Sequence, residues 1–112
     1  TKLIDRIIAS QLVMREKRFT ARLKPSDVFD EYKGVKTDVT VIIQGAVDLA
    51  FVEDGKLVIV DYKTDRVKDI TKLAGLYKKQ LYLYKSAMEQ SEELTVKECI
   101  LCSIHLGAYI TV

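Results

Sequence analysis

Two runs of apolar and β-branched residues, 39–52 and 56–63, are joined through a turn formed by Asp54 and Gly55. An Asp-Gly pair between such runs is typical of a type I′ β-hairpin, because both central residues of that turn need positive φ. A hairpin closed by a two-residue turn also has a fixed register. The sequence therefore predicts which residues of the two strands face each other.

In this register Glu53 faces Lys56, and Asp48 lies directly opposite Asp61. Side chains alternate between the two faces of a strand, so the two carboxylates share one face. Both faces are otherwise apolar, which predicts a central hairpin covered on both sides. The carboxylate face also carries Ala46, Ala50, Val52, Leu57, Ile59 and Lys63, and the other face carries Val47, Leu49, Phe51, Val58, Val60 and Tyr62.

Two facing carboxylates in an apolar setting destabilise a fold, because like charges repel and burial removes their hydration. A shared proton offsets this cost, and so does a hard cation such as Mg²⁺, which prefers carboxylate, water and phosphate oxygens. Lys63 follows Asp61 by two residues and adds a positive charge on the same face. The alternative is a structural Asp–Lys pair at a strand end, with Asp48 turned toward water. The residues alone leave both interpretations open.

The other segments predict helices packed on a mixed sheet, which is an α/β or α+β domain. Apolar residues at helical spacing predict one helix over 3–14 and another over 70–89, the second weakened at Gly75. A break at 25–27 leads into one helical turn around 28–32, and a polar loop follows at 34–38. The remaining strands are expected at 17–24, 94–104 and 108–112.

Length and composition exclude several classes of protein. The 112 residues fit one domain, and 48% apolar with 30% charged residues is typical of a globular chain. No apolar run reaches the roughly 20 residues of a membrane helix, and the first residues lack a signal-peptide pattern. Two cysteines are too few for a disulfide scaffold, so a reduced, cytoplasmic setting is expected. A net charge of +2 neither indicates nor excludes a polyanionic partner.

Three motifs occur in order: Gly45-Ala46-Val47-Asp48, then Ile59-Val60-Asp61-Tyr62-Lys63-Thr64-Asp65, then Gln80-Leu81-Tyr82-Leu83-Tyr84. Together they resemble the GxxD…DYKT…QxxxY pattern of RecB-type nucleases in the PD-(D/E)XK superfamily. The resemblance covers nearly the whole chain and is strongest to the C-terminal nuclease domains of AddA-type helicase–nuclease subunits. It implies a restriction-endonuclease-like core. Because the chain begins with Thr1, we expect residues 1–112 to be one nuclease domain from a longer helicase–nuclease chain.

The resemblance implies a Mg²⁺-dependent DNA exonuclease that hydrolyses phosphodiester bonds in double-strand break repair and recombination, with Mn²⁺ able to substitute. It makes Asp48, Asp61 and the backbone carbonyl of Tyr62 the metal ligands. Lys63 would orient or activate the attacking water and stabilise charge on the phosphate. The implied partners are DNA and an AddB-like subunit, and ATP would be bound only by a motor part outside this chain.

The alternative is a catalytically inactive nuclease-fold module that binds DNA or assembles subunits. Family members usually carry an upstream His that contributes to the metal site, whereas the single His of this chain, His105, follows both aspartates. The isolated chain is therefore expected to depend on an upstream helix for full activity. Glu16 matches an upstream family Glu and is either a supporting acid or a solvated charge.

Gln80 and Tyr84 are four residues apart and share one face of the predicted helix. A Gln on an apolar stripe needs polar partners. It is either a satisfied core residue or, as the resemblance implies, a catalytic-site residue that acts with Tyr84 to position the catalytic strand or the DNA backbone.

Other chemistry-bearing residues have simpler interpretations. Cys99 and Cys102 form a CxxC on a predicted strand, where they point to opposite faces, so core positions are expected rather than a zinc site. His105 is expected to be structural or exposed. The long predicted helix and the residues just before it are rich in lysine, which indicates either a solvated face or a track for a DNA strand. These lysines are Lys68, Lys72, Lys78, Lys79 and Lys85.

Overall fold

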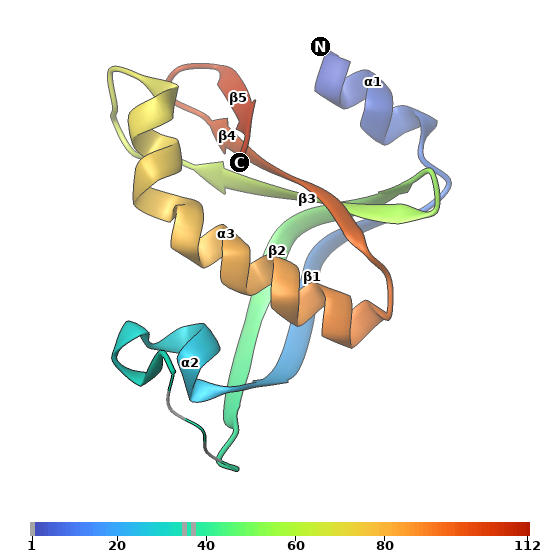
Figure 1. Ribbon diagram of the computed structural model, residues 1–112. Helices are drawn as coiled ribbons and strands as arrows, with labels where there is room; N and C mark the ends of the chain where they lie inside the picture. Colours follow the sequence, from blue (N-terminus) through green and yellow to red (C-terminus); the bar gives the residue numbers. More distant parts are fainter. Residues whose placement is uncertain (1, 35, 37) are drawn as a thin grey trace.

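The structure is a computed structural model that describes residues 2–34, 36 and 38–112. Within these residues, five strands form one mixed sheet in the order β1-β2-β3-β4-β5 (Figure 1). β3 and β4 are parallel, with α3 as the connection between them, and the other neighbouring strands are antiparallel. The elements are α1 (Lys2–Ala9), β1 (Val13–Leu23), α2 (Pro25–Val28), the 3₁₀ turn η1 (Asp30–Tyr32), β2 (Val41–Glu53), β3 (Lys56–Lys63), α3 (Ile70–Glu92), β4 (Val96–Ser103) and β5 (Ala108–Thr111). This α+β architecture confirms the predicted fold class.

The hairpin of β2 and β3 forms in the predicted register. Asp54 and Gly55 have φ values of 55° and 72°, the two positive values that a type I′ turn requires. Glu53 pairs with Lys56, and regular pairing continues to Leu49 opposite Val60. The hairpin thus supplies two inner strands of the sheet.

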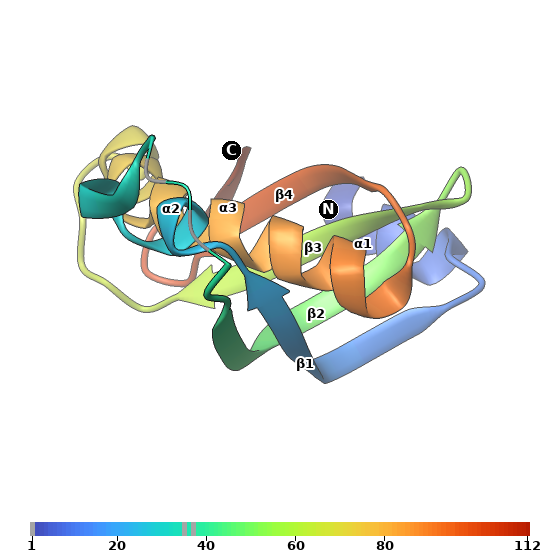
Figure 2. The same cartoon turned by 60° about the horizontal axis from the view of Figure 1, so that its bottom comes forward.

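Apolar side chains pack on both faces of the sheet, as predicted for a central hairpin. α3 crosses one face (Figure 2), where Leu73, Leu81 and Met88 join a core that includes Leu57 and Ile59 of β3. On the opposite face α1 buries Leu3 against Leu49, Phe51, Val58, Val60 and Ile100. Among the described residues no helix is both long and apolar enough to cross a membrane.

β2 changes the face that it presents to the core near Asp48, and here the alternation argument is wrong. It groups Val47 with Leu49, but Val47 is fully buried with Ala50 beneath α3, while Leu49 belongs to the core under α1. Glu16 lies between Arg15 and Lys17, which pair with Leu49 and Val47, and has a φ of 46°, in the left-handed region. Such a residue increases the local twist of a strand pair. The long β1–β2 ribbon bends correspondingly (Figure 1).

The first helix ends at Ala9, well before the predicted end at residue 14, and β1 correspondingly begins at Val13. The hydroxyl of Ser10 donates to the carbonyl of Val52 at 2.7 Å, and the N–H of Val52 donates to the carbonyl of Leu12 at 3.0 Å. The segment 10–14 therefore bonds to β2 and joins the sheet, although its apolar spacing also fits a helix.

Other boundaries also differ from the predictions. α3 runs through Gly75 without a break and ends at Glu92, three residues beyond the predicted end. The turn expected at 28–32 is a short helix that starts at Pro25, followed by the 3₁₀ turn. Within the polar loop expected at 34–38, residues 35 and 37 lie outside the described residues.

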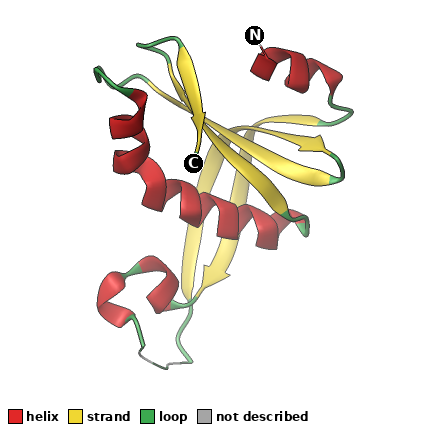
Figure 3. Cartoon of the chain, turned by 45° about the horizontal axis from the view of Figure 1, so that its top comes forward, coloured by secondary structure: helices red, strands yellow, loops and turns green. Residues whose placement is uncertain are grey.

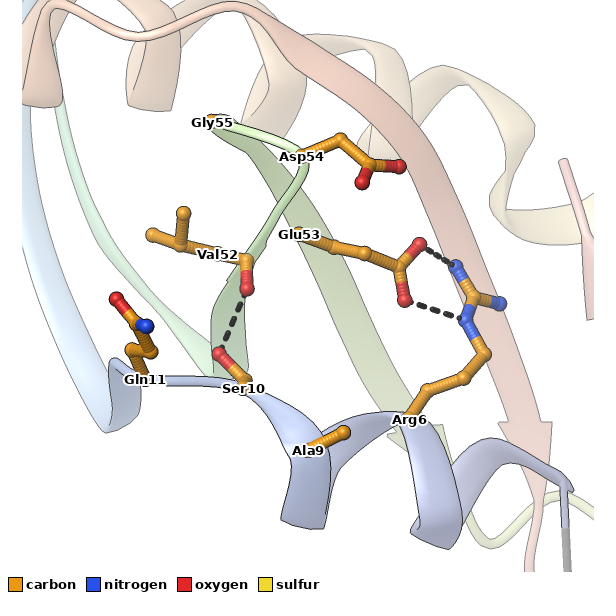
Figure 4. A pocket seen from close by; sticks show the side chains of 8 residues that line it. All are labelled: Arg6, Ala9, Ser10, Gln11, Val52, Glu53, Asp54 and Gly55. Carbon is orange, nitrogen blue, oxygen red and sulfur yellow. Dashed lines mark hydrogen bonds and ion pairs between the residues drawn. The ribbon is translucent and has the colours of Figure 1, made fainter.

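α1 lies beside the hairpin turn, away from α3 (Figure 3), and an ion-pair network holds it there. Arg6 donates to both carboxylate oxygens of Glu53, at 3.0 and 2.9 Å, and to Glu98 at 2.6 Å. Lys97 bridges Glu53 and Asp54 at 2.7 and 3.0 Å. Hydrogen bonds from Arg6 and Lys97 lower the pKa of Glu53 to about 2. Figure 4 shows Arg6 and Glu53 bonded to each other in the pocket between α1 and the turn. We therefore interpret this pocket as the place where α1 is attached to the hairpin.

Candidate active site

The structure brings the two hairpin carboxylates together where the regular pairing of β2 and β3 ends. That pairing stops at Leu49 and Val60, one position short of Asp48 and Asp61. The Oδ2 atom of Asp48 instead accepts the backbone N–H of Tyr62 at 2.8 Å. Burial is the main cause that raises the pKa of Asp61, and the neighbouring Asp48 carboxylate adds to the rise. The two aspartates are thus neighbours, but through their side chains rather than as a ladder pair.

Asp61 is the buried member of the pair. The residue is 4% exposed, and among the described residues its Oδ2 atom has no hydrogen-bond partner. Lys63 Nζ approaches the same oxygen within 3.1 Å, as an ion pair without hydrogen-bond alignment. Burial is the main cause that raises the pKa of Asp61 to about 6; Lys63 opposes the rise and Asp48 adds to it. A buried carboxylate oxygen without a hydrogen bond is costly, and Lys63 offsets this cost only in part, because the pKa of Asp61 still rises.

Lys63 is tied to this carboxylate and to α3. Its Nζ atom donates to Oε1 of Gln80 at 2.8 Å and lies 4.1 Å from the centroid of the Tyr77 ring. Burial alone would lower the pKa of Lys63, but the ion pair with the Asp61 carboxylate outweighs burial, so this pKa is raised. Lys63 therefore carries a positive charge at neutral pH, beside the buried carboxylate.

α3 brings Gln80 and Tyr84 to the end of β3, as their shared helix face predicts. The amide oxygen of Gln80 accepts a hydrogen bond from Lys63, which gives this oxygen the polar partner that it needs. Tyr84 packs edge-on against Phe19 of β1, with ring centroids 5.6 Å apart. Burial and then the charge of Asp61 raise the pKa of Tyr84, so its hydroxyl stays protonated near this charge.

The glycine of the first motif makes room for this packing. A Cβ atom built on Gly45 would lie 2.8 Å from Cζ of Phe19. Phe19 is 4% exposed and is held between β2 and Tyr84, so its ring has little room to move. Gly45 therefore supports the position of Tyr84 through Phe19.

We expect Gly45→Ala to lower the free energy of unfolding by about 1–3 kcal/mol, the usual cost of forcing extra atoms into a packed core. Urea unfolding measures this change. The matched control is Gly75→Ala on α3, where an added Cβ meets no described atom within 4 Å. That control should gain about 0.5–1 kcal/mol from helix propensity. An unchanged unfolding midpoint for Gly45→Ala would contradict the packing argument.

Tyr77 and Asp65 also contact the site, although sequence reasoning gives neither a role and only Asp65, at the end of the second motif, lies in one of the motifs. The hydroxyl of Tyr77 donates to the carboxylate oxygens of Asp65 at 3.1 and 2.8 Å, while its ring faces Lys63. One signal could have found Tyr77. It precedes Gln80 by three residues and so lies on the same face of α3.

The remaining predicted site residues are less closely joined. Among the described residues, no group of three or more His, Cys, Asp or Glu side chains lies close enough to hold a metal ion, so Glu16 does not gather with the two aspartates. Glu16 is exposed on β1. Tyr62 has its N–H on Asp48, and its side chain is 42% exposed on the α1 side. A metal-binding role for the Tyr62 carbonyl stays a prediction.

The cysteines and the histidine lie where the simpler interpretations put them, and the positions of the lysines fit both a solvated face and a track for DNA. Both cysteines are free; Cys99 is in the core beneath α3, and Cys102 packs on the opposite face. Burial raises the pKa of Cys99 to about 11. His105 is exposed in the turn between β4 and β5. Of the basic residues on and before α3, Lys68, Lys72, Lys78 and Lys79 are exposed and Lys85 is partly buried.

Comparison with known proteins agrees with this geometry. The family model described as the PD-(D/E)XK nuclease superfamily matches residues 3–108. The chain is 33% identical to an ATP-dependent helicase/nuclease subunit from Clostridium acetobutylicum over 96% of this chain and 9% of that relative. It is 35% identical to the protein of the same name from Clostridioides difficile over 85% of this chain and 8% of that relative. The chain thus spans less than a tenth of the length of these relatives, and it belongs to the PD-(D/E)XK nuclease superfamily.

Proposed function

We propose that this chain is the metal-dependent DNA exonuclease domain of a longer helicase–nuclease that acts in double-strand break repair and recombination. The observation that carries this proposal is the buried Oδ2 atom of Asp61, which lacks a hydrogen bond within the described residues although Asp48 and charged Lys63 lie beside it. The names of the relatives, which are helicase/nuclease subunits, support the same conclusion.

The chemistry of the donor set fits a divalent cation. The buried oxygen of Asp61 makes no hydrogen bond to the described residues, and Asp48 supplies a second carboxylate, the ligand type that hard cations prefer. Asp48, Asp61 and the backbone carbonyl of Tyr62 would hold Mg²⁺, with Mn²⁺ able to replace it. When bound, the cation would polarise a phosphoryl oxygen and lower the pKa of a water molecule.

The side chains around this position would perform the other parts of the reaction. Lys63, charged and hydrogen-bonded to Gln80, would stabilise the negative charge that develops on the phosphate and orient the attacking water. Asp48 holds the backbone of Tyr62 and so fixes the end of β3 next to Asp61. Tyr84, whose hydroxyl stays protonated, would donate to the DNA backbone from α3.

End-labelled linear DNA, single-stranded and double-stranded, tests this proposal. With millimolar Mg²⁺ or Mn²⁺ we expect nucleotides to be released from the ends, no release with EDTA, and no cleavage of a covalently closed circle. The assay is run on this chain and on a longer chain that contains it, because the sequence predicts dependence on an upstream helix. Linear DNA left intact by both would contradict the proposal.

A second candidate is a non-catalytic module that binds DNA or assembles subunits. The observation that favours it is the absence, among the described residues, of a third acidic or histidine side chain gathered with Asp48 and Asp61. DNA binding that is unaffected by metal, without cleavage in the assay above, would support this candidate. In either case we propose that an ATP-driven motor and an AddB-like partner belong to the longer protein, in a cytoplasmic setting.

A further inference from the structure

We propose that Tyr77 is a positioning residue for Lys63, and that Asp65 holds the Tyr77 ring in place for this task. The inference rests on the proposed function in one respect, because Lys63 is the residue that would stabilise charge on the phosphate. It assigns a role to Tyr77, which lies outside the family motifs, and to Asp65, which ends the second motif without an assigned role.

The contact between Lys63 and Tyr77 has the geometry of a cation–π interaction. The ammonium nitrogen lies 4.1 Å from the ring centroid, well inside the limit of about 6 Å for such contacts. The Lys63 side chain is 17% exposed, so little water competes for its charge. A cation–π contact is stronger where the cation is desolvated.

Asp65 fixes the ring through its hydroxyl group. The Tyr77 hydroxyl reaches both oxygens of Asp65, at 3.1 and 2.8 Å. Donation to a carboxylate makes the hydroxyl harder to ionise, and the pKa of Tyr77 is accordingly raised. The phenol therefore stays a neutral donor, and its hydrogen bond to an anion polarises the ring toward the cation. Because Asp65 follows Lys63 by only two residues, the single side chain of Tyr77 contacts both of them at the end of β3.

The arrangement gives Lys63 an attraction that does not depend on Asp61. A lysine side chain has four rotatable bonds and follows the nearest negative charge. Asp61 is also a proposed metal ligand, so its hold on Lys63 would weaken when a cation shares the carboxylate. The uncharged contacts with Tyr77 and Gln80 would remain and keep the ammonium group in place.

Nuclear magnetic resonance of the metal-free chain tests the contact without any assay of activity. The ring current of Tyr77 should shift the ε-methylene protons of Lys63 upfield. This shift should survive in Tyr77→Phe and disappear in Tyr77→Leu. The matched control is Tyr82→Leu, which removes a tyrosine from the same helix that is 60% exposed and should leave the Lys63 signals unchanged.

Kinetics on linear DNA tests the positioning role. We expect Tyr77→Leu to lower kcat by about 3- to 30-fold, the range that a cation–π contact supports, with KM nearly unchanged. Tyr77→Phe should restore part of the loss. Asp65→Ala should match Tyr77→Phe, and the double variant should be no worse than either, because both remove the same hydrogen bond.

Each outcome bears on a different claim. Lys63 protons without an upfield shift in the wild type would overturn the contact. A shift that is lost in Tyr77→Leu while kcat stays unchanged would overturn the positioning role and leave the proposed function intact. If neither this chain nor the longer chain hydrolyses DNA, the proposed function fails, and the proton shift still decides whether Tyr77 contacts Lys63. If Tyr77→Leu does not fold, Tyr77→Phe and Asp65→Ala must both show the partial loss of kcat.

Discussion

Replacing Asp61 with asparagine should abolish DNA hydrolysis and, at the same time, stabilise the metal-free domain above about pH 6. Hydrolysis is lost because an amide is a poor ligand for Mg²⁺ compared with a carboxylate. Stability rises because the amide would carry no buried charge beside Asp48, whereas the Asp61 carboxylate is 4% exposed and lacks a hydrogen bond to Oδ2 among the described residues. A substitution that removes activity and raises the free energy of unfolding identifies a group that serves function and destabilises the fold.

The stability gain should depend on pH in a defined direction. The folded pKa of Asp61 is about 6, mainly because of burial, and an unfolded aspartate titrates near about 3.9. Between these values the folded protein keeps a proton that the unfolded chain has released, so stability falls as pH rises. Above about pH 6 the ionised group costs on the order of 2–3 kcal/mol, and below about pH 4 it costs nothing.

Urea unfolding in EDTA, at about pH 4 and about pH 7.5, measures this difference between wild type and Asp61→Asn. The two should be equally stable at the lower pH, and the variant should be more stable at the higher. Asp27→Asn, at an exposed position on α2, is the matched control and should change little at either pH. A variant less stable than wild type at the higher pH would mean that the ion pair with Lys63 is structural. A stable variant with full activity would mean that the carboxylate is not used.

Lys63→Met is the second change from which we expect a large effect: a fall in kcat of about 100-fold or more. Methionine approximates the length of the lysine stem but removes the charge beside the phosphate. Metal binding should persist, because both proposed carboxylate ligands remain. The loss also deprives Oε1 of Gln80 of its donor and removes the cation that opposes the raised pKa of Asp61.

Initial rates over a range of DNA concentrations separate kcat from KM for this variant. Lys78→Met is the matched control, since Lys78 is an exposed lysine on the same helix that carries Gln80. We expect it to keep kcat and, if the basic face guides DNA, to raise KM modestly. A Lys63→Met enzyme with the kcat of the wild type would contradict the role assigned to the lysine.

The sequence predicts the hairpin well because its turn is local. Positive φ at Asp54 and Gly55 follows from these residue types, since Asp tolerates the left-handed region and Gly lacks a Cβ atom, and the register follows from the turn. The face of Val47 and the end of the first helix could not be predicted in the same way. Both depend on how β1 pairs with β2, which puts Glu16 at positive φ and takes Leu12 and Val13 into the sheet.

The residues of the candidate site also fall into those that local sequence predicts and those that depend on tertiary packing. Asp48, Asp61 and Lys63 lie within one hairpin, so its register predicts that they are neighbours, although the carboxylates lie just beyond the last ladder pair. Gln80 and Tyr84 could be proposed from a motif on one helix face. The contacts of Tyr77 with Lys63 and Asp65 depend on the path of the connection from β3 and on the angle at which α3 crosses the sheet. Hydrophobic periodicity specifies neither of these.

Thermal unfolding of this chain with increasing Mn²⁺ or Mg²⁺, beside Asp61→Asn and Asp48→Asn, tests the central claim most directly. At 100 times its dissociation constant a ligand stabilises by about 2.7 kcal/mol, which for a domain of this size is a rise in Tm of roughly 10 °C. We expect this rise for the wild type and its absence in both variants. A wild type unaffected by millimolar metal, or variants that rise equally, would contradict a metal site built on the two aspartates.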